Sequence, residues 1–144
     1  MSLLDSFVSE VCKAFSLDPS VLRSCIAKID GAVFVNCTPH YIVFEDGEKV
    51  NGYEDLARLL RARVAYRRVR IHGEIEFVKP FFEVTGEGLK LVDIARNYGI
   101  YLVGSLISAQ AYGYPVVSPV VTPETSSKPP EERRCYRKRW NCWW

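Results

Sequence analysis

The sequence predicts an α+β fold: a single domain with a mixed β-sheet and packed helices, preceded by an N-terminal helical hairpin. Apolar residues recur at steps of three and four over residues 3–29, which is the spacing of amphipathic helices. After Gly31, strand-like segments rich in β-branched and aromatic residues alternate with helix-like segments. Such interleaving is typical of helices packed on one sheet. We assign residues 1–121 to this domain, and residues 122–144 to a Pro/Ser-rich arm and a basic, aromatic tail.

Residues 1–30 form the predicted helical hairpin, whose first helix spans residues 3–16 with one apolar stripe. Asp18 is the expected N-cap of the second helix and Pro19 its first residue, because proline lacks only an N–H that would be unpaired there. The apolar face of this second helix consists of Leu22, Cys25, Ile26 and Ile29. Asp30-Gly31 is expected to end it. Two helices this short must dock on the rest of the domain.

Residues 32–121 are expected to form the sheet and its helices. In chain order we predict strands at 32–36 and 40–45, a helix at 53–62, strands at 63–71 and 74–84, a helix at 89–99, a strand at 100–104, a helix at 105–113 and an extended segment at 114–123. The strand at 63–71 alternates, with Val64, Tyr66 and Arg68 on one face and Arg63, Ala65, Arg67 and Val69 on the other. Pro80 predicts an edge position or a bulge in the following strand.

Composition excludes several classes of protein. The chain has 144 residues, of which 48% are hydrophobic and 25% charged, so it supplies apolar surface for one core. No apolar run approaches the roughly 20 residues of a membrane span. The N-terminus is acidic and lacks the basic start of a secretory signal. We therefore expect a soluble protein of the cell interior with no membrane partner.

The net charge of +2 conceals an uneven distribution. Residues 1–57 carry 4 basic and 9 acidic side chains, whereas residues 58–70 carry 6 basic side chains and no acid. Residues 71–130 carry 4 basic and 6 acidic side chains, and residues 131–144 carry 5 and 2. Positive charge is concentrated in the second and fourth segments, where an anionic partner would bind.

The first basic block consists of Arg58, Arg61, Arg63, Arg67, Arg68 and Arg70. Guanidinium groups stay charged and present a fork of donors that suits phosphate oxygens. Two interpretations are open. Nearby carboxylates neutralise the block within the fold or at an interface, or the block binds nucleic acid or another anionic surface. The carboxylates in question are Glu54, Asp55, Glu74 and Glu76.

The second basic block lies in the tail and consists of Arg133, Arg134, Arg137, Lys138 and Arg139, interleaved with Tyr136, Trp140, Trp143 and Trp144. Cations and aromatic planes together suit a segment that follows phosphates and stacks on bases. The alternative is that the tryptophans pack on the domain or across a subunit interface, since such large apolar groups are rarely left in water. The second alternative predicts a homo-oligomer.

Five cysteines, at positions 12, 25, 37, 135 and 142, show no repeated short spacing, so they do not form a secreted disulfide framework. Cys12 and Cys25 lie on apolar faces of neighbouring helices and are either core residues or a disulfide pair. Cys37 and His40 have C-x2-H spacing, but no second close pair completes a zinc site. We expect no metal, no cofactor and no catalytic residues, and we lean against an enzyme.

The segment Asn36-Cys37-Thr38-Pro39-His40 resembles the Asn-Leu-Thr-Pro-His opening of a small family of phage, archaeal-virus and prophage-borne proteins. The resemblance covers residues 33–130 and continues through Arg63, the Ala-Gln-Ala around Gln110 and a Pro-x-Thr segment at Thr125. It implies a virus-encoded protein of the host cytoplasm or the virion, and no activity is established for the family. One Gln and one Met in the chain are consistent with a hyperthermophilic host.

Asn36, Thr38 and His40 flank a proline, where short polar side chains commonly fix a turn. Their alternative role is a ligand pocket shared with Arg63, Gln110 and Thr125. For the whole protein we expect a non-enzymatic binding function with nucleic acid as ligand class. The alternatives are oligomerisation through the aromatic tail and the ligand pocket around Asn36, His40 and Arg63.

Overall fold

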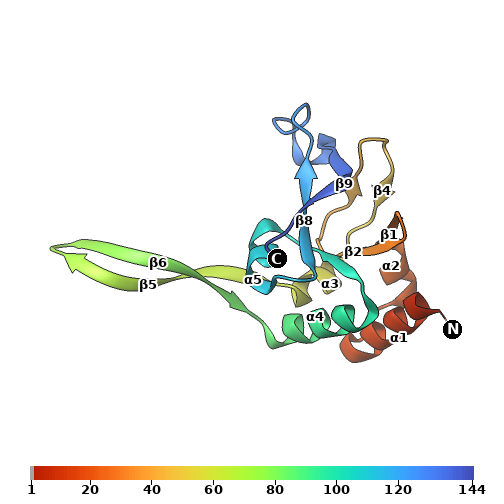
Figure 1. Cartoon of the computed structure of the whole chain (residues 1–144), viewed down its shortest axis with the longest axis horizontal. Helices are drawn as coiled ribbons and strands as arrows, with labels where there is room; N and C mark the ends of the chain where they lie inside the picture. The colour runs from red at the N-terminus through yellow and green to blue at the C-terminus, as the bar shows by residue number, and fades with distance from the viewer. Residues whose placement is uncertain (1) are drawn as a thin grey trace.

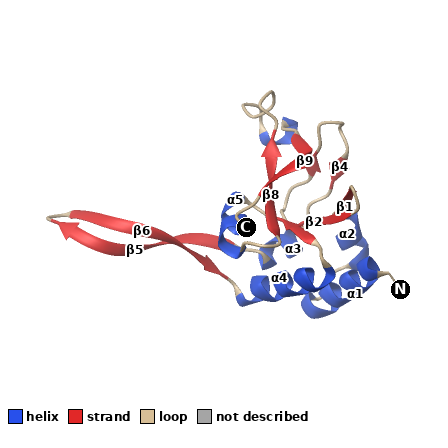
Figure 2. Ribbon diagram, in the orientation of Figure 1, coloured by secondary structure: helices blue, strands red, loops and turns tan. Residues whose placement is uncertain are grey.

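The centre of the molecule is a five-stranded mixed sheet. The computed structural model describes residues 2–144, and the sheet has the order β1 (Ile26–Ile29), β2 (Ala32–Asn36), β7 (Tyr101–Val103), β8 (Val116–Val121) and β9 (Cys135–Asn141). Strands β2, β7 and β8 are parallel, whereas β1 and β9 pair antiparallel at the two edges. The predicted α+β class is thereby confirmed (Figures 1 and 2).

Alternating side chains of the sheet contact two different layers. Val35, Leu102 and Val116 are buried against a layer of helices: α1 (Leu3–Phe15), α2 (Pro19–Ser24), α3 (Glu54–Leu59), α4 (Gly86–Tyr98) and α5 (Leu106–Tyr112). The neighbouring residues Phe34, Val103 and Val117 belong to a second core, which the short hairpin of β3 (Ile42–Val43) and β4 (Lys49–Val50) covers together with Trp140. This is the period of two that a strand imposes when both faces of its sheet are covered.

The N-terminal helix begins with a capping box. The backbone N–H of Asp5 donates to Ser2 Oγ, and the Asp5 carboxylate accepts in return from the Ser2 N–H, so two of the unpaired donors at the helix start are satisfied. Asp18 and Pro19 cap and start α2 as expected. None of the helices in residues 2–144 is long and apolar enough to cross a membrane.

The second helix is shorter than predicted. It ends at Ser24, and Ile26–Ile29 form the edge strand β1. The prediction took Asp30-Gly31 as a helix end, but both residues have positive φ, +48° and +80°, and join β1 to β2 as a hairpin. Asp-Gly with two positive φ values is typical of the tight turn whose twist matches antiparallel strands. Asp30-Gly31 therefore indicated a β-hairpin. The prediction placed a helix there because Ile26 and Ile29 also have helical spacing.

The C-terminal tail belongs to the central sheet. Residues 135–141 form β9, which pairs antiparallel with β8 and so closes the sheet at that edge. Residues 122–134, expected as a surface arm or a disordered segment, form turns and a short 3₁₀ helix (Pro130–Glu132) that connect β8 to β9. The Thr122 N–H donates to the Arg134 carbonyl at 2.9 Å, which closes this loop.

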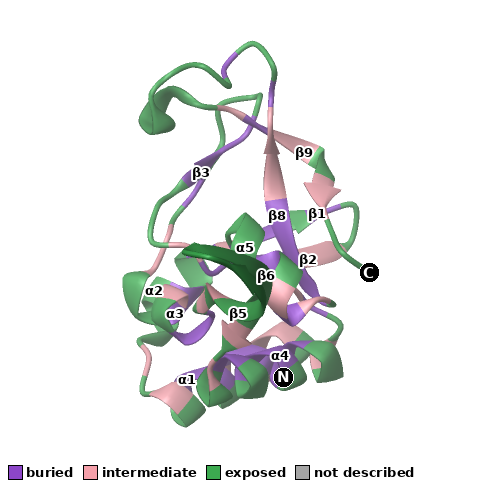
Figure 3. Ribbon diagram, turned by 90° about the vertical axis from the view of Figure 1, so that its left-hand side faces the viewer, coloured by how far each residue is buried: buried purple, intermediate pink, exposed green. Residues whose placement is uncertain are grey.

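The strands β5 (Ala62–His72) and β6 (Ile75–Val84) form an antiparallel pair, called the long hairpin below. The predicted strands at 63–71 and 74–84 are confirmed with nearly the same bounds. The long hairpin projects from the body of the molecule, and no other helix or strand of residues 2–144 lies beside its outer part (Figure 1). Residues from Tyr66 to Phe82 are all exposed (Figure 3).

Side-chain hydroxyls hold the base of the long hairpin. They donate to three consecutive backbone carbonyls from the last residue of α3 to the residue before β5: Thr85 to Leu59 at 3.0 Å, Ser108 to Leu60 at 2.8 Å and Tyr112 to Arg61 at 2.6 Å. The Tyr112 hydroxyl also accepts from the Thr85 N–H at 3.2 Å, directly after β6. One tyrosine of α5 thus joins the incoming and outgoing ends of the long hairpin, which fixes its root to the body.

Replacing Tyr112 by Phe should destabilise the protein. The change removes a half-buried hydroxyl and leaves the Arg61 carbonyl and the Thr85 N–H without their partner, at a cost of about 1–3 kcal/mol. Urea unfolding of the variant measures the loss in the free energy of unfolding. Tyr66→Phe is the matched control, because the exposed Tyr66 hydroxyl makes no hydrogen bond within residues 2–144. Equal stability of the two variants would contradict this role of Tyr112.

Candidate nucleic-acid interface

The register of β5 and β6 sorts the side chains of the long hairpin into two faces, because paired residues share a face and successive pairs alternate. The first, called the basic face, carries Arg63, Arg67, Arg70 and Lys79 together with Ala65, His72, Ile75, Phe77, Phe81 and Glu83. The second, called the apolar face, carries Ala62, Val64, Tyr66, Arg68, Ile71, Glu76, Val78, Pro80, Phe82 and Val84. The long hairpin therefore offers two chemically different surfaces.

A β-bulge at Val69 determines the face on which Arg70 lies. The pairing passes from Arg68 opposite Val78 to Arg70 opposite Phe77, so Val69 has no partner in the register. An extra residue in one strand shifts the alternation of everything beyond it. Without the bulge, Arg70 would share the face of Arg68. With the bulge, it joins Arg67 on the basic face.

Three cations of the basic face make no ion pair within residues 2–144. Arg67, Arg70 and Lys79 are exposed. None of the carboxylates of the long hairpin pairs with these three cations. Glu83 accepts from Arg63 at 2.5 Å, and Glu76 accepts from Arg68 at 3.1 Å on the apolar face. The expected neutralisation of the first basic block by nearby acids is therefore only partial.

Arg58 and Arg61 continue the line of cations from the long hairpin onto the body. Arg58 pairs with Glu54 at 3.2 Å and with Asp55 at 3.8 Å, on the same helix. Arg61 makes no ion pair in the described chain and lines two hollows. One, of about 580 Å³, lies at the root of the long hairpin, and the other, of about 280 Å³, lies against the body.

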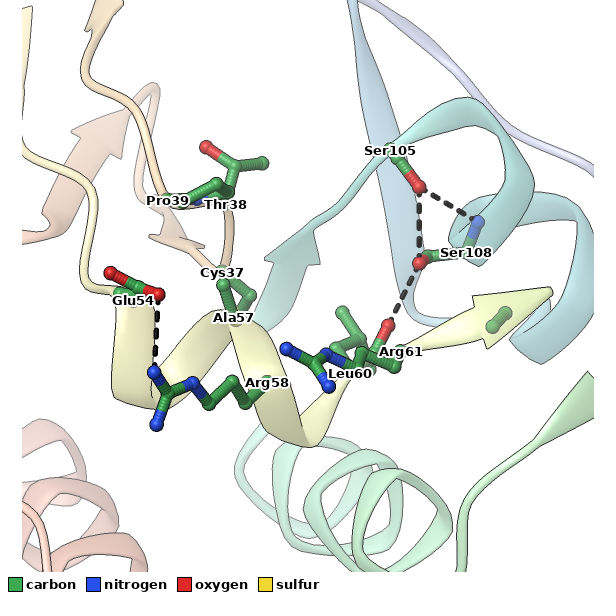
Figure 4. A pocket seen from close by; sticks show the side chains of 11 residues that line it. Cys37, Thr38, Pro39, Glu54, Ala57, Arg58, Leu60, Arg61, Ser105 and Ser108 are labelled. Atoms are coloured by element: carbon green, nitrogen blue, oxygen red, sulfur yellow. Dashed lines mark hydrogen bonds and ion pairs between the residues drawn. The ribbon is translucent and has the colours of Figure 1, made fainter.

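The smaller hollow lies where β2 and β7 end. Thr38 and Pro39 follow β2, Ser105 and Ser108 follow β7, and the guanidinium groups of Arg58 and Arg61 lie along α3 (Figure 4). The Ser105 hydroxyl donates to Ser108 Oγ at 3.1 Å, and the Ser108 hydroxyl in turn donates to the Leu60 carbonyl at 2.8 Å. Glu54 also lines this hollow and pairs with Arg58, so Arg61 is the one guanidinium of its lining that makes no ion pair in the described chain.

The predicted motif residues do not gather into one pocket. Asn36 fixes its own turn: its Oδ1 accepts from the N–H and the hydroxyl of Thr38, and its Nδ2 donates to backbone carbonyls that include His40 at 3.0 Å and Asn51 at 3.1 Å. These bonds use the full capacity of the amide. The other members lie elsewhere: Pro39 exposed in the same loop, Arg63 on the long hairpin, Gln110 exposed on α5 and Thr125 bonded to Thr122 and Arg134.

Two of the five cations of the second basic block, Arg137 and Lys138, form ion pairs within the fold. Arg137 pairs with Asp46 and Glu48, both at 2.7 Å, and lies over the Phe44 ring. The backbone N–H of Glu48, which has the larger effect, and the Arg137 guanidinium both hold the pKa of Asp46 below its usual value. Lys138 pairs with Asp30, whereas Arg133, Arg134 and Arg139 make no ion pair within residues 2–144: Arg133 donates to the Lys128 carbonyl, Arg139 lies over the Tyr136 ring and Arg134 bonds Thr125 through its backbone alone.

Two of the three tail tryptophans pack on the sheet of their own chain. The Trp140 ring stacks on Phe34 at 4.7 Å between centroids, and its Nε1 donates to the Arg137 carbonyl. Trp144 stacks on Tyr101 and donates through Nε1 to the Val116 carbonyl at 3.2 Å. Trp143 is 42% exposed and Trp144 52% exposed, so both retain surface for other contacts.

The cysteines are free thiols, so Cys12 and Cys25 are not joined as a disulfide. Burial raises the pKa of the Cys37 thiol far above its ordinary value, and also raises those of Cys12, Cys25 and Cys135. All four are therefore protonated core residues at neutral pH and poor nucleophiles. In the described residues, no three His, Cys, Asp or Glu side chains form a group that could hold a metal ion.

Sequence reasoning missed the contribution of β6 to the basic face. Lys79 lies opposite Arg67, and Phe81 and Phe77 lie opposite Ala65 and Arg70. A signal was present, because the strand predicted at 74–84 carries Lys79 two residues from Phe77 and Phe81, which places the three side chains on one face. The register that brings the two strands together depends on the bulge and on the turn at Gly73, and neither follows from alternation alone.

Comparison with known protein families, with curated proteins and with solved structures finds no match for this chain. The resemblance at Asn36–His40 therefore stays a prediction, and the interface described above depends on the geometry of the long hairpin.

Proposed function

We propose that the protein binds nucleic acid with the basic face of the long hairpin. The observation that carries the proposal is the group formed by Arg67, Arg70 and Lys79, which are exposed, share one face and have no ion pair in the described chain. Arg61 extends this row toward the body. A row of unneutralised cations on a projecting element binds phosphates and releases their counterions, which is the main source of nucleic-acid affinity.

The dimensions of the long hairpin support this role. β5 has 11 residues, which corresponds to a length of about 35 Å at 3.3 Å per residue. One turn of duplex DNA has a similar length of about 34 Å. A two-stranded ribbon also fits the width of the major groove. The exposed rings of Phe77 and Phe81 lie among the cations and offer stacking surfaces for unpaired bases.

The proposal favours binding along the long hairpin over binding at the tail. In the tail, Arg137 is surrounded by two carboxylates and an aromatic ring, and only 20% of its side chain is exposed. Charges that are paired within the fold contribute little to counterion release. The viral source and the location in a host cell that the Asn36–His40 resemblance implies are part of the same proposal.

Affinity for nucleic acid should fall steeply with salt. Four unpaired cations, Arg61, Arg67, Arg70 and Lys79, give a slope of log K against log salt of about −4 for duplex and about −3 for single strands. Between about 50 and 200 mM salt the duplex affinity should fall about 100-fold. Fluorescence anisotropy with a labelled duplex and a labelled single strand measures both slopes. No binding of either form at low salt would overturn the proposal.

The double variant Arg67→Ala, Arg70→Ala should reduce the magnitude of the slope by about 2. The matched control is Arg23→Ala, Arg96→Ala, which removes the same charge from residues outside the long hairpin and outside both basic blocks. Arg23 is already paired with Asp5, and Arg96 with Asp93. The control should change the slope by much less. Equal effects of the two double variants would mean that net charge, and not the basic face, governs binding.

A further inference from the structure

The apolar face of the long hairpin carries five exposed large apolar side chains, whereas the basic face carries three. Tyr66 is 65% exposed, Ile71 52%, Val78 42% and Phe82 40%. Pro80 lies opposite Tyr66 and is exposed as well. Monomeric soluble proteins rarely leave a contiguous surface of this kind in water.

An isolated two-stranded ribbon also lacks the layer that normally stabilises strands. Two strands alone are at best marginally stable in water and need a further strand, helix or sheet on an apolar face. The body of the molecule supplies that layer only at the root, where Tyr112 and Thr85 hold the ends of β5 and β6. From Tyr66 outward, the apolar face has no covering element (Figure 1).

We propose that the apolar face packs against the apolar face of a second copy of this chain. Such a contact is isologous, because each copy contributes the same residues and a two-fold axis relates them. The two ribbons then form a small sandwich with about 10 Å between its layers. The proposal is independent of nucleic-acid binding, since it uses the opposite face of the long hairpin.

The charges of the long hairpin favour a second copy as the occupant. The apolar face holds one cation, Arg68, and one anion, Glu76, which pair with each other at 3.1 Å. A second copy presents the same two charges, so Arg68 of either chain can face Glu76 of the other without net repulsion. The basic face cannot associate with itself in this way, because Arg67, Arg70 and Lys79 would face like charges.

The area of the apolar face also fits such a contact. With about 100 Å² of apolar surface for each large side chain, two copies would together cover about 1,000 Å², which is near the lower limit of specific protein interfaces. We therefore expect a dimer with a dissociation constant in the micromolar range. Both basic faces remain exposed in it, on opposite sides of the sandwich.

A charge placed on the apolar face should prevent dimer formation. Phe82→Glu would bury one unpaired carboxylate from each copy, so the dissociation constant should rise about 100-fold or more. Phe81→Glu is the matched control, since Phe81 is the neighbouring residue, equally exposed, on the basic face. Sedimentation velocity of the wild type and both variants, without nucleic acid, measures the dimer fraction, and circular dichroism checks that each variant folds.

Two charge reversals should restore the dimer only when they are mixed. Arg68→Glu gives an apolar face with two anions, and Glu76→Arg gives one with two cations, so each variant should be mainly monomeric. An equimolar mixture should form heterodimers, because each face then meets opposite charges. Rescue by mixing requires contact between chains and cannot arise from the pair within one chain. Native mass spectrometry distinguishes the heterodimer if one variant carries an isotope label.

Several results would overturn the proposal. A wild-type protein that stays monomeric up to about 100 μM excludes the expected dimer. A dimer that persists in Phe82→Glu places the interface elsewhere, for example at the exposed tail tryptophans. If Phe82→Glu leaves the mass unchanged but weakens oligonucleotide binding as much as Arg67→Ala, Arg70→Ala, the occupant of the apolar face is nucleic acid. If the wild type dimerises but binds no oligonucleotide, the result contradicts the proposed function and leaves the dimer proposal standing.

Discussion

The direction of the long hairpin depends on hydrogen bonds at its root. Three hydroxyls, from Thr85, Ser108 and Tyr112, donate to the carbonyls of residues 59–61, at the end of α3 and before the start of β5. Each bond contributes about 1 kcal/mol, and each unpaired carbonyl would cost more. Because Ser108 and Tyr112 belong to α5, which packs on the central sheet, the orientation of the long hairpin is determined by the core of the body.

The two basic blocks differ because one stays on the body and the other leaves it. Strand β9 lies beside the turn between β3 and β4, so Arg137 meets Asp46 and Glu48 within 2.7 Å. The long hairpin leaves the acidic segments behind, and of its three glutamates Glu76 and Glu83 pair with Arg68 and Arg63, whereas Glu74 at the turn makes no ion pair within residues 2–144. Both blocks contain paired and unpaired cations, but Arg67 and Arg70 share one face of a projecting hairpin, whereas the unpaired arginines of the tail lie on the body. Position in the fold, rather than the number of cations, decides which block can meet a partner.

Much of this fold follows from periodicity, and the failures have physical causes. The strands at 63–71 and 74–84 and the caps at Asp18 and Ser105 were predictable, because they depend on local alternation and local hydrogen bonds. The edge strand β1 was not, since Ile26 and Ile29 satisfy both helical spacing and a short strand, and only pairing with β2 decides between them. Asn36 was readable as a turn residue. The face of the hairpin on which Arg70 lies could not be predicted from the sequence, because the bulge at Val69 depends on cross-strand register.

That bulge resolves a conflict between two physical requirements. A two-stranded ribbon needs an apolar face that another layer can cover, whereas phosphate binding needs cations that remain in water. Regular alternation through Arg67-Arg68-Val69-Arg70 would put Arg68 and Arg70 on the same face as Tyr66 and Phe82. With Val69 displaced from the register, only Arg68 stays there, and Glu76 balances its charge. One unpaired residue therefore lets a short arginine-rich segment supply the neutral surface that we propose is buried and the cationic surface that we propose binds nucleic acid.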